Sequence, residues 1–164
     1  MKIRPFLQTD APDVDALALR AFDQFAGHYR PWGEFRARIA HMSAMPMEIW
    51  LAEEAGRLLG AVGLVPPGQG TDARFSPDWA VIRMLVVDPA HRGIGLGRGL
   101  TECCIDRARN LGAKAIGLHT SPIMEVALGL YLRMGFKKMQ DIDDIYGVPY
   151  AIYKLDWNRD LAAR

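Results

Sequence analysis

The sequence predicts an α/β domain with three layers, in which helices cover both faces of a mixed, mostly antiparallel sheet containing one parallel strand pair. Two observations carry this prediction. Strand-like and helical segments alternate over residues 1–164 without a linker, repeat or low-complexity tract, which is typical of one domain. Segment 79–87 is almost entirely apolar, as in a strand buried on both faces, and the helical pattern of 96–111 follows after a short loop.

The elements of the first half follow from proline, glycine and apolar spacing. Pro5 limits the pairing of the first strand, which makes it an edge strand. Thr9 or Asp10 caps the first helix, whose apolar residues recur at helical spacing until Gly27. In chain order we expect a strand at 2–6, helices at 11–26 and 32–42, a hairpin of strands at 48–53 and 57–65, and a loop at 66–77.

The second half is divided by glycines. Gly112 and Gly135 end two helical patterns, and Tyr146-Gly147 turns the final strand pair. In chain order we expect a strand at 79–87, a helix at 96–111, a strand at 115–119, a helix at 124–134, and antiparallel strands at 136–145 and 148–156.

Composition excludes several classes of protein. With 50% hydrophobic residues and a net charge of +1, the composition indicates binding neither to nucleic acid nor to an anionic membrane surface. No apolar run approaches the roughly 20 residues that span a bilayer. The N-terminal segment lacks the apolar stretch of a secretory signal, and Cys103 and Cys104 are too close for a normal disulfide, so we expect a cytoplasmic protein. We assign no metal ligands.

The loop before helix 96–111 carries the strongest chemical signal. Four glycines alternate at Gly93, Gly95, Gly97 and Gly99, although each glycine inside a helix costs about 1 kcal/mol relative to alanine. The flanking charges, Arg92 and Arg98, have the wrong sign for a helix N-terminus. A bound phosphate explains both anomalies, because bare amides and arginines would hold it there.

Two familiar phosphate loops do not fit these glycines. A P-loop needs a Gly-Lys-Ser or Gly-Lys-Thr ending, which is missing here. The dinucleotide fingerprint needs a third glycine where this chain has Arg98 or Leu100. A nucleotide-binding module is therefore disfavoured.

Two motifs resemble the GNAT superfamily of N-acetyltransferases. The first is Arg92-x-x-Gly95-x-Gly97, preceded by Leu85-x-Val87-x-Pro89, and the second is Ala127-x-x-Leu130-Tyr131-x-x-x-Gly135-Phe136. They occur in the family's order, and the resemblance covers about residues 58–155. It implies a GNAT-like fold, in which the parallel strand pair is splayed, and acetyl-CoA as co-substrate.

The resemblance also implies a set of site residues. The backbone of the strand at Leu85, Val86 and Val87 would face the cofactor, with the Leu85 N–H polarising the thioester carbonyl. Tyr131 would lie near the sulfur and return a proton to the thiolate. The residues expected to bind the pyrophosphate are Arg92, Gly93, Ile94, Gly95, Leu96, Gly97 and Arg98.

Two positions depart from the family pattern. Met124 stands where many relatives have a cofactor-contacting Asn, and Val81 stands where some have a glutamate base. Without that base, deprotonation of the amine could pass through water to Glu48, Glu53 or Asp78, or to His119 near the expected site. An amine of low pKa could need little help.

Candidate acceptor residues come from the same strand and from variable walls. Arg83 is a charge in an apolar strand, and it either binds an acceptor carboxylate or forms an internal salt bridge. Unless a bulge intervenes, it shares a face with Val81, Leu85 and Val87. The expected walls are 22–32, 66–79 and 141–150, with Tyr146 and His119 as further candidate substrate residues; their aromatics could instead form core or a dimer face.

The combined interpretation is an enzyme that moves an acetyl group from acetyl-CoA to a primary amine by direct attack. The expected partner is a small-molecule amine or amino-acid derivative, with a homodimer left open. Neither Cys103 nor Cys104 has the setting of a nucleophile, so no acetyl-enzyme is expected. The alternatives are a protein N-terminal or lysine acetyltransferase, and a non-catalytic sensor that binds acyl-CoA.

Overall fold

The computed structural model describes residues 1–157 and is built around a mixed sheet. Within these residues the strands are β1 (Lys2–Pro5), β2 (Glu48–Glu54), β3 (Arg57–Val65), β4 (Trp79–Val87), β5 (Ala115–Thr120), β6 (Lys137–Ile145) and β7 (Val148–Leu155). The helices are α1 (Ala11–Phe22), α2 (Trp32–Ile39), α3 (Leu96–Asn110) and α4 (Glu125–Arg133). The strand order is β1-β2-β3-β4-β5-β7-β6, and only β4 and β5 pair in parallel.

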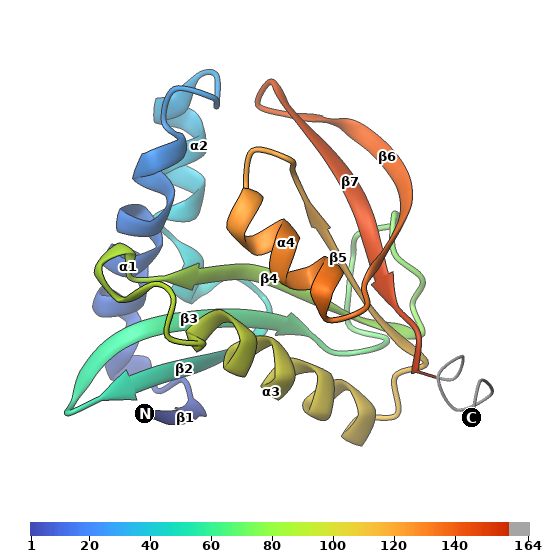
Figure 1. Ribbon diagram of the computed structural model, residues 1–164, viewed down its shortest axis with the longest axis horizontal. Coiled ribbons are helices and arrows are strands. Elements are labelled where there is room, and N and C mark those ends of the chain that lie inside the picture. The colour runs from blue at the N-terminus through green and yellow to red at the C-terminus, as the bar shows by residue number, and fades with distance from the viewer. Residues whose placement is uncertain (158–164) are drawn as a thin grey trace.

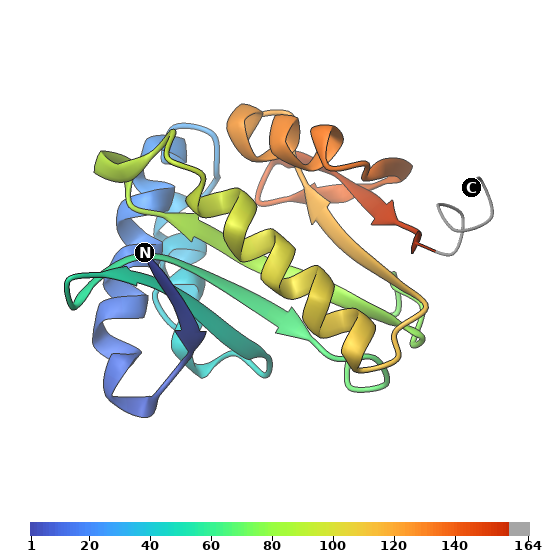
Figure 2. The ribbon, with the colours of Figure 1, turned by 60° about the horizontal axis from the view of Figure 1, so that its bottom comes forward.

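The sheet separates two layers of helices. Helices α1 and α2 pack on one face, and α3 and α4 pack on the other, as Figures 1 and 2 show. An apolar cluster lies on each side: Leu96, Leu100 and Tyr131 belong to the α3–α4 side, whereas Leu17 and Phe35 belong to the α1–α2 side. The predicted three-layer α/β class with a mostly antiparallel sheet is therefore confirmed.

Two helices are shorter than the sequence predicted. The helix expected at 11–26 ends at Phe22 and continues as a tighter 3-10 helix at Asp23–Phe25. The helix expected at 32–42 ends at Ile39, and a separate 3-10 helix covers Met42–Ala44. Such turns are common at helix ends, where few backbone bonds remain to hold the α geometry. None of the described helices has both the length and the apolar character needed to cross a membrane.

Strands β4 and β5 separate after a short paired region. They pair only at Trp79–Ala115, Ala80–Ile116 and Val81–Gly117, so β4 continues from Ile82 to Val87 without β5 beside it. Figure 1 shows β4 and β5 diverging from a common end, with α4 packed over β5. The splay exposes one edge of β4, and Arg83 to Leu85 are half-buried, whereas the sequence predicted burial along the whole strand.

A bulge lies in the unpaired part of β4. Ala61 pairs with Val86 and Gly63 with Arg83, so β4 has one more residue than β3 over this stretch, and Met84 has a φ of 57°. The bulge reverses the alternation of side chains. Leu85 and Val87 pack with the α3–α4 cluster, together with Ile82. The bulge is the exception that the sequence analysis allowed for: Arg83 lines one cavity with Val81, but it does not share a face with Leu85 and Val87.

Candidate active site

The glycine loop presents a row of free amides at the start of α3. Gly93 and Gly95 have φ values of 80° and 84°, a left-handed conformation that side chains other than glycine rarely adopt. Gly95 is the N-cap residue of α3 and supplies no side-chain cap. Within the described chain, no amide from Gly93 to Arg98 donates to a main-chain carbonyl, and the first such bond is from Gly99 to Gly95. These donors need an anionic or polar partner.

The other two glycines have a different role. A Cβ on Gly97 would lie 3.3 Å from the Leu130 side chain and 3.8 Å from that of Leu85, and one on Gly99 would lie 3.4 Å from Ile3. Gly97 therefore lets α3 approach both α4 and β4, and Gly99 lets it approach β1. The sequence interpretation has all four glycines open the backbone to a phosphate. Only Gly93 and Gly95 have the left-handed conformation that such a role would explain.

A cavity of about 490 Å³ opens in front of these amides; we name it the first cavity. It lies between β4, the glycine loop, the C-terminal end of α1 and the start of α4. Its wall includes Leu85, Val87, Arg92, Gly95, Gly97 and Arg98, all of them predicted site residues. Met124, where the family pattern has Asn, also lines it, and the Thr120 hydroxyl lies 3.7 Å from the Met124 sulfur.

The two arginines of the loop border the first cavity differently. Arg92 donates to the Gln24 side chain at 3.0 Å and reaches across toward the end of α1. Arg98 points along α3 and pairs with Glu102 at 3.1 Å, with about half of its side chain exposed. Both guanidiniums retain unused donors because each makes one side-chain bond among the described residues.

The residues around the first cavity fit a diphosphate-bearing carrier. Free amides at a helix N-terminus and two arginines provide donors and positive charge for the diphosphate. The apolar side of the cavity, formed by Leu85, Val87 and Leu130, suits an extended arm. The cavity volume falls within the range of about 300–1,000 Å³ typical of small-molecule sites.

Tyr131 lies on α4 in the apolar cluster beside α3. It is 5% exposed, and its ring centre is 5.5 Å from that of Phe136. Burial raises the pKa of its phenol above the ordinary value, which keeps the group protonated at neutral pH. Its hydroxyl makes no hydrogen bond to another side chain of residues 1–157, so it remains available as a donor.

His119 lies on β5 beyond the end of the β4–β5 pairing. The centre of its ring lies 6.1 Å from that of Phe75 and 5.2 Å from that of Tyr150. Its buried Nδ1 has no hydrogen-bond partner among the described residues. Burial, together with the positive charges of Arg74 and Arg83, lowers the pKa of His119 to about 4. The imidazole is therefore neutral at physiological pH.

The three acidic residues considered as proton acceptors are held elsewhere. Glu48 pairs with Arg107 at 3.0 Å, and the hydrogen bond to Arg107 lowers the pKa of its carboxyl. Glu53 pairs with Arg4 at 3.1 Å, and Asp78 lies 3.6 Å from Lys114. Among the described residues, none of these three carboxylates lines the first cavity.

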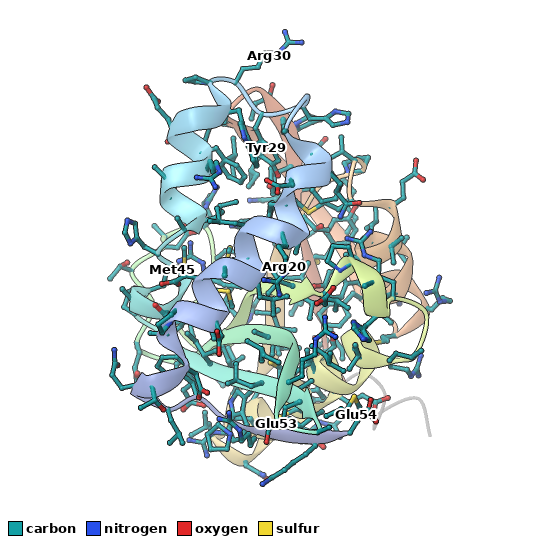
Figure 3. All side chains as sticks on the ribbon, turned by 90° about the vertical axis from the view of Figure 1, so that its left-hand side faces the viewer. Arg20, Tyr29, Arg30, Met45, Glu53 and Glu54 are labelled. Carbon is teal, nitrogen blue, oxygen red and sulfur yellow. The ribbon has the colours of Figure 1, made fainter. Side chains whose placement is uncertain are left out.

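The expected aromatic walls come together between α2 and the β6–β7 turn. Tyr29 stacks on Phe35 with ring centres 3.7 Å apart, and its hydroxyl bonds to that of Tyr150. The Tyr146 ring lies 5.4 Å from Phe35, and its carbonyl accepts from the Arg30 amide at 2.8 Å. In Figure 3 the Tyr29 side chain points into the molecule, whereas Arg30 points away from it.

Sequence reasoning missed several residues of the first cavity. Ile123 lies outside both motifs, Arg133 occupies a variable position of the second motif, and Gln24 belongs to the 22–32 wall expected at the acceptor; all three line the first cavity. His91 also lines it; its buried Nδ1 has no hydrogen-bond partner in the described chain and lies 3.8 Å from the Asp88 carboxylate. The sequence carried no local signal for them because the first cavity is assembled from distant segments. Across residues 1–157, no group of three or more His, Cys, Asp or Glu side chains could hold a metal.

Curated relatives are similar in sequence to part of the chain. It is 34% identical over 120 residues to the mycothiol acetyltransferase of Cellulomonas flavigena, covering 72% of this chain and 34% of that protein. It is 35% identical over 89 residues to N-acetyltransferase 8B of Homo sapiens, covering 54% and 38%. The chain thus spans between a third and a half of the length of these relatives.

Solved structures share the fold. A GNAT family acetyltransferase from Brucella melitensis in complex with acetyl-CoA superposes with a TM-score of 0.64 at 24% identity, covering 95% of this chain and 87% of that one. An N-acetyltransferase from Staphylococcus aureus gives a TM-score of 0.71 at 20% identity, covering 94% and 97%. Residues 13–136 match the Acetyltransferase (GNAT) family, and the chain belongs to that family.

Proposed function

We propose that this protein transfers an acetyl group from acetyl-CoA to a primary amine by direct attack. One observation carries the proposal: the free amides of the glycine loop and the unpaired edge of β4 border the same cavity. Membership of the family supports it. A single extended molecule with an anionic end and an amide-bearing arm would satisfy both sets of backbone groups.

The cofactor-binding residues would be those of the loop and of the adjoining strand. The amides from Gly93 to Arg98 would bind the diphosphate, and Arg92 and Arg98 would add charge-assisted hydrogen bonds. The backbone of Leu85, Val86 and Val87 would pair with the amides of the arm. The acetyl-CoA thioester supplies an acetyl group already activated for transfer.

Leu85 and Tyr131 would serve the chemistry. Neither Leu85 nor the preceding Met84 has a register partner on β3, so the Leu85 N–H would donate to the carbonyl oxygen as negative charge develops there. Tyr131 would give its proton to the departing sulfur. The phenol is protonated at the pH of the reaction, as this role requires, but burial raises its pKa and makes it a weaker acid than a free tyrosine. The place of Tyr131 in the family motif, and not its pKa, supports the role.

The acceptor would attack as the neutral amine. Val81 is buried and offers no proton acceptor where some relatives have glutamate. The pKa of about 4 makes His119 a weak base for an ammonium group. Water would therefore take the proton. A small-molecule amine is favoured over a protein chain because both cavities beside β4 are of small-molecule size.

A thiol-release assay with a panel of primary amines tests the proposal. We expect thiol release that depends on the amine, and a Tyr131→Phe variant with a kcat lowered by about 10²-fold or more at unchanged affinity for CoA. Tyr153→Phe is the matched control, because Tyr153 is buried in the same cluster at 6% exposure and has no proposed role. Tight CoA binding without release for any amine would instead identify a non-catalytic sensor.

A further inference from the structure

A second cavity of about 420 Å³ lies beside the N-terminal half of β4. Its roof is the loop of residues 66–78, and its floor includes Val81 and Arg83. Phe75 and Trp79 are among its walls, and most of the surface that lines the cavity is apolar. It is separate from the first cavity, since the two share no lining residue in the described chain.

Arg83 brings an uncompensated charge to the second cavity. Its side chain is half-buried, and among residues 1–157 it makes neither an ion pair nor a side-chain hydrogen bond. Burial lowers the pKa of its guanidinium, which reflects the cost of holding this charge away from water. A charge that is partly withdrawn from water is stabilised by a partner of opposite charge, and an anionic ligand in the second cavity would supply one.

Asp72, the acidic group whose charge acts on Arg83, does not neutralise it. The Asp72 carboxylate is committed to Arg74, with contacts of 2.7–3.2 Å to its guanidinium and 3.0 Å to its amide. Asp72 attracts Arg83 only through space, while Arg38 and Arg74 repel it. His119, which faces the same group of charges, is neutral. The local balance is therefore positive and suits an anionic ligand.

The splay places this positive charge beside the reacting centre. Arg83 lies past the last β4–β5 pair at Val81–Gly117, so no strand closes the space on that side of β4. Leu85 lies two residues further, about 7 Å along the strand. Because of the bulge at Met84, the two side chains lie on opposite faces of the sheet. A ligand held by Arg83 would reach Leu85 through the opening between the strands.

We propose that the acetyl acceptor is an amine that also carries a carboxylate, and that Arg83 binds this carboxylate in the second cavity. The substrate class is then amino acids and small derivatives that keep a free carboxylate, with any side chain against the aromatic walls at Phe75 and Trp79. This inference rests on the proposed acetyl transfer. In that step the ammonium first loses one proton to water, the neutral nitrogen bonds to the acetyl carbon, and the carbon–sulfur bond breaks. Tyr131 gives its proton to the departing sulfur and is reprotonated by the second proton that the nitrogen loses as the amide forms.

The experiment compares amino acids with their carboxamides in the thiol-release assay. The amide's amine is the weaker base and is more often neutral, so a preference for the acid would run against intrinsic reactivity. We expect the wild type to favour the acids. Arg83→Met should lower kcat/KM for the acids by about 10- to 100-fold, as for a lost charge-assisted hydrogen bond. Its kcat/KM for the amides and its affinity for CoA should stay unchanged.

Two further variants separate charge from packing. Arg83→Lys should recover part of the preference for acids, because it keeps the positive charge. Arg36→Met removes an arginine from the exposed surface of α2 and should leave the preference unchanged. Calorimetry of an amino acid titrated into the CoA complex gives a readout besides turnover, with binding expected in the wild type and lost in Arg83→Met.

The outcomes distinguish the two proposals. Equal turnover of acids and amides, or an Arg83→Met variant that keeps the preference, would overturn the carboxylate inference and leave acetyl transfer standing. Binding of CoA with no turnover of any amine would overturn both proposals. A preference for acids that is lost in Arg83→Met and partly recovered in Arg83→Lys would support the inference.

Discussion

Gly95→Ala should weaken both the fold and the binding of CoA, by separate and measurable amounts. Gly95 has a φ of 84°, and a Cβ there would meet nothing within 4 Å, so the penalty is conformational rather than steric. An alanine held in this left-handed region costs about 1–2 kcal/mol of stability. The backbone also shifts to relieve part of this strain, and the amides at the start of α3 then turn away from the cavity. Losing one hydrogen bond to a charged group costs about 1.5–3 kcal/mol, so CoA affinity should fall at least about tenfold.

Gly112→Ala provides the matched control. Gly112 follows α3 at its other end with a φ of 79°, and a Cβ there would also meet nothing within 4 Å. Its stability loss in urea unfolding should match that of Gly95→Ala, but its CoA affinity, measured by calorimetry, should equal the wild type. Equal CoA affinity in both variants would refute the assignment of the anion site to the start of α3.

Three further predictions concern stability, acceptor binding and the cysteines. Asp10→Asn should cost about 1 kcal/mol above pH 3.8, the ordinary pKa of this carboxyl, because the hydrogen bond to Arg4 lowers its pKa in the folded protein; the difference from wild type in urea unfolding should shrink below pH 3.8 and vanish only once pH falls below the lowered folded pKa. Gly117→Ala would place a Cβ 3.0 and 3.1 Å from two aromatic rings of the second cavity, so KM for the amine should rise about tenfold while CoA affinity holds. Burial raises the pKa of both Cys103 and Cys104, so a variant with both replaced by serine or alanine should keep its turnover; loss of an acetyl-enzyme in that variant would contradict direct attack.

Local signals were enough to predict the elements of this fold. Glycines at the ends of helical patterns and β-branched runs placed nearly every strand and helix within a few residues. The helix expected at 11–26 was too long because apolar spacing continues through Phe25, whereas the backbone tightens into a 3-10 helix after Phe22. Periodicity does not distinguish these two helical geometries over three residues.

The sequence pattern did not predict the position of the bulge in β4. Nothing in the apolar run around Met84 marks a left-handed residue, and methionine rarely adopts a φ of 57°. The bulge arises from the pairing of β4 with β3, where Gly63 admits the Met47 side chain and faces the Arg83 carbonyl. One extra residue then decides which side chains of β4 face each cavity.

The amino-acid sequence alone determined the family, the order of the elements and the glycine loop at the start of α3, because each depends on residues close together in the chain. Tertiary structure alone decided that the side chains of Leu85 and Arg83 lie on opposite faces of the sheet. It also decided that the carboxylates at 48, 53 and 78 form ion pairs with arginine or lysine side chains, and that Asp72 pairs with Arg74. Charge compensation depends on distances between segments remote in the chain, and those distances exist only after the sheet has formed.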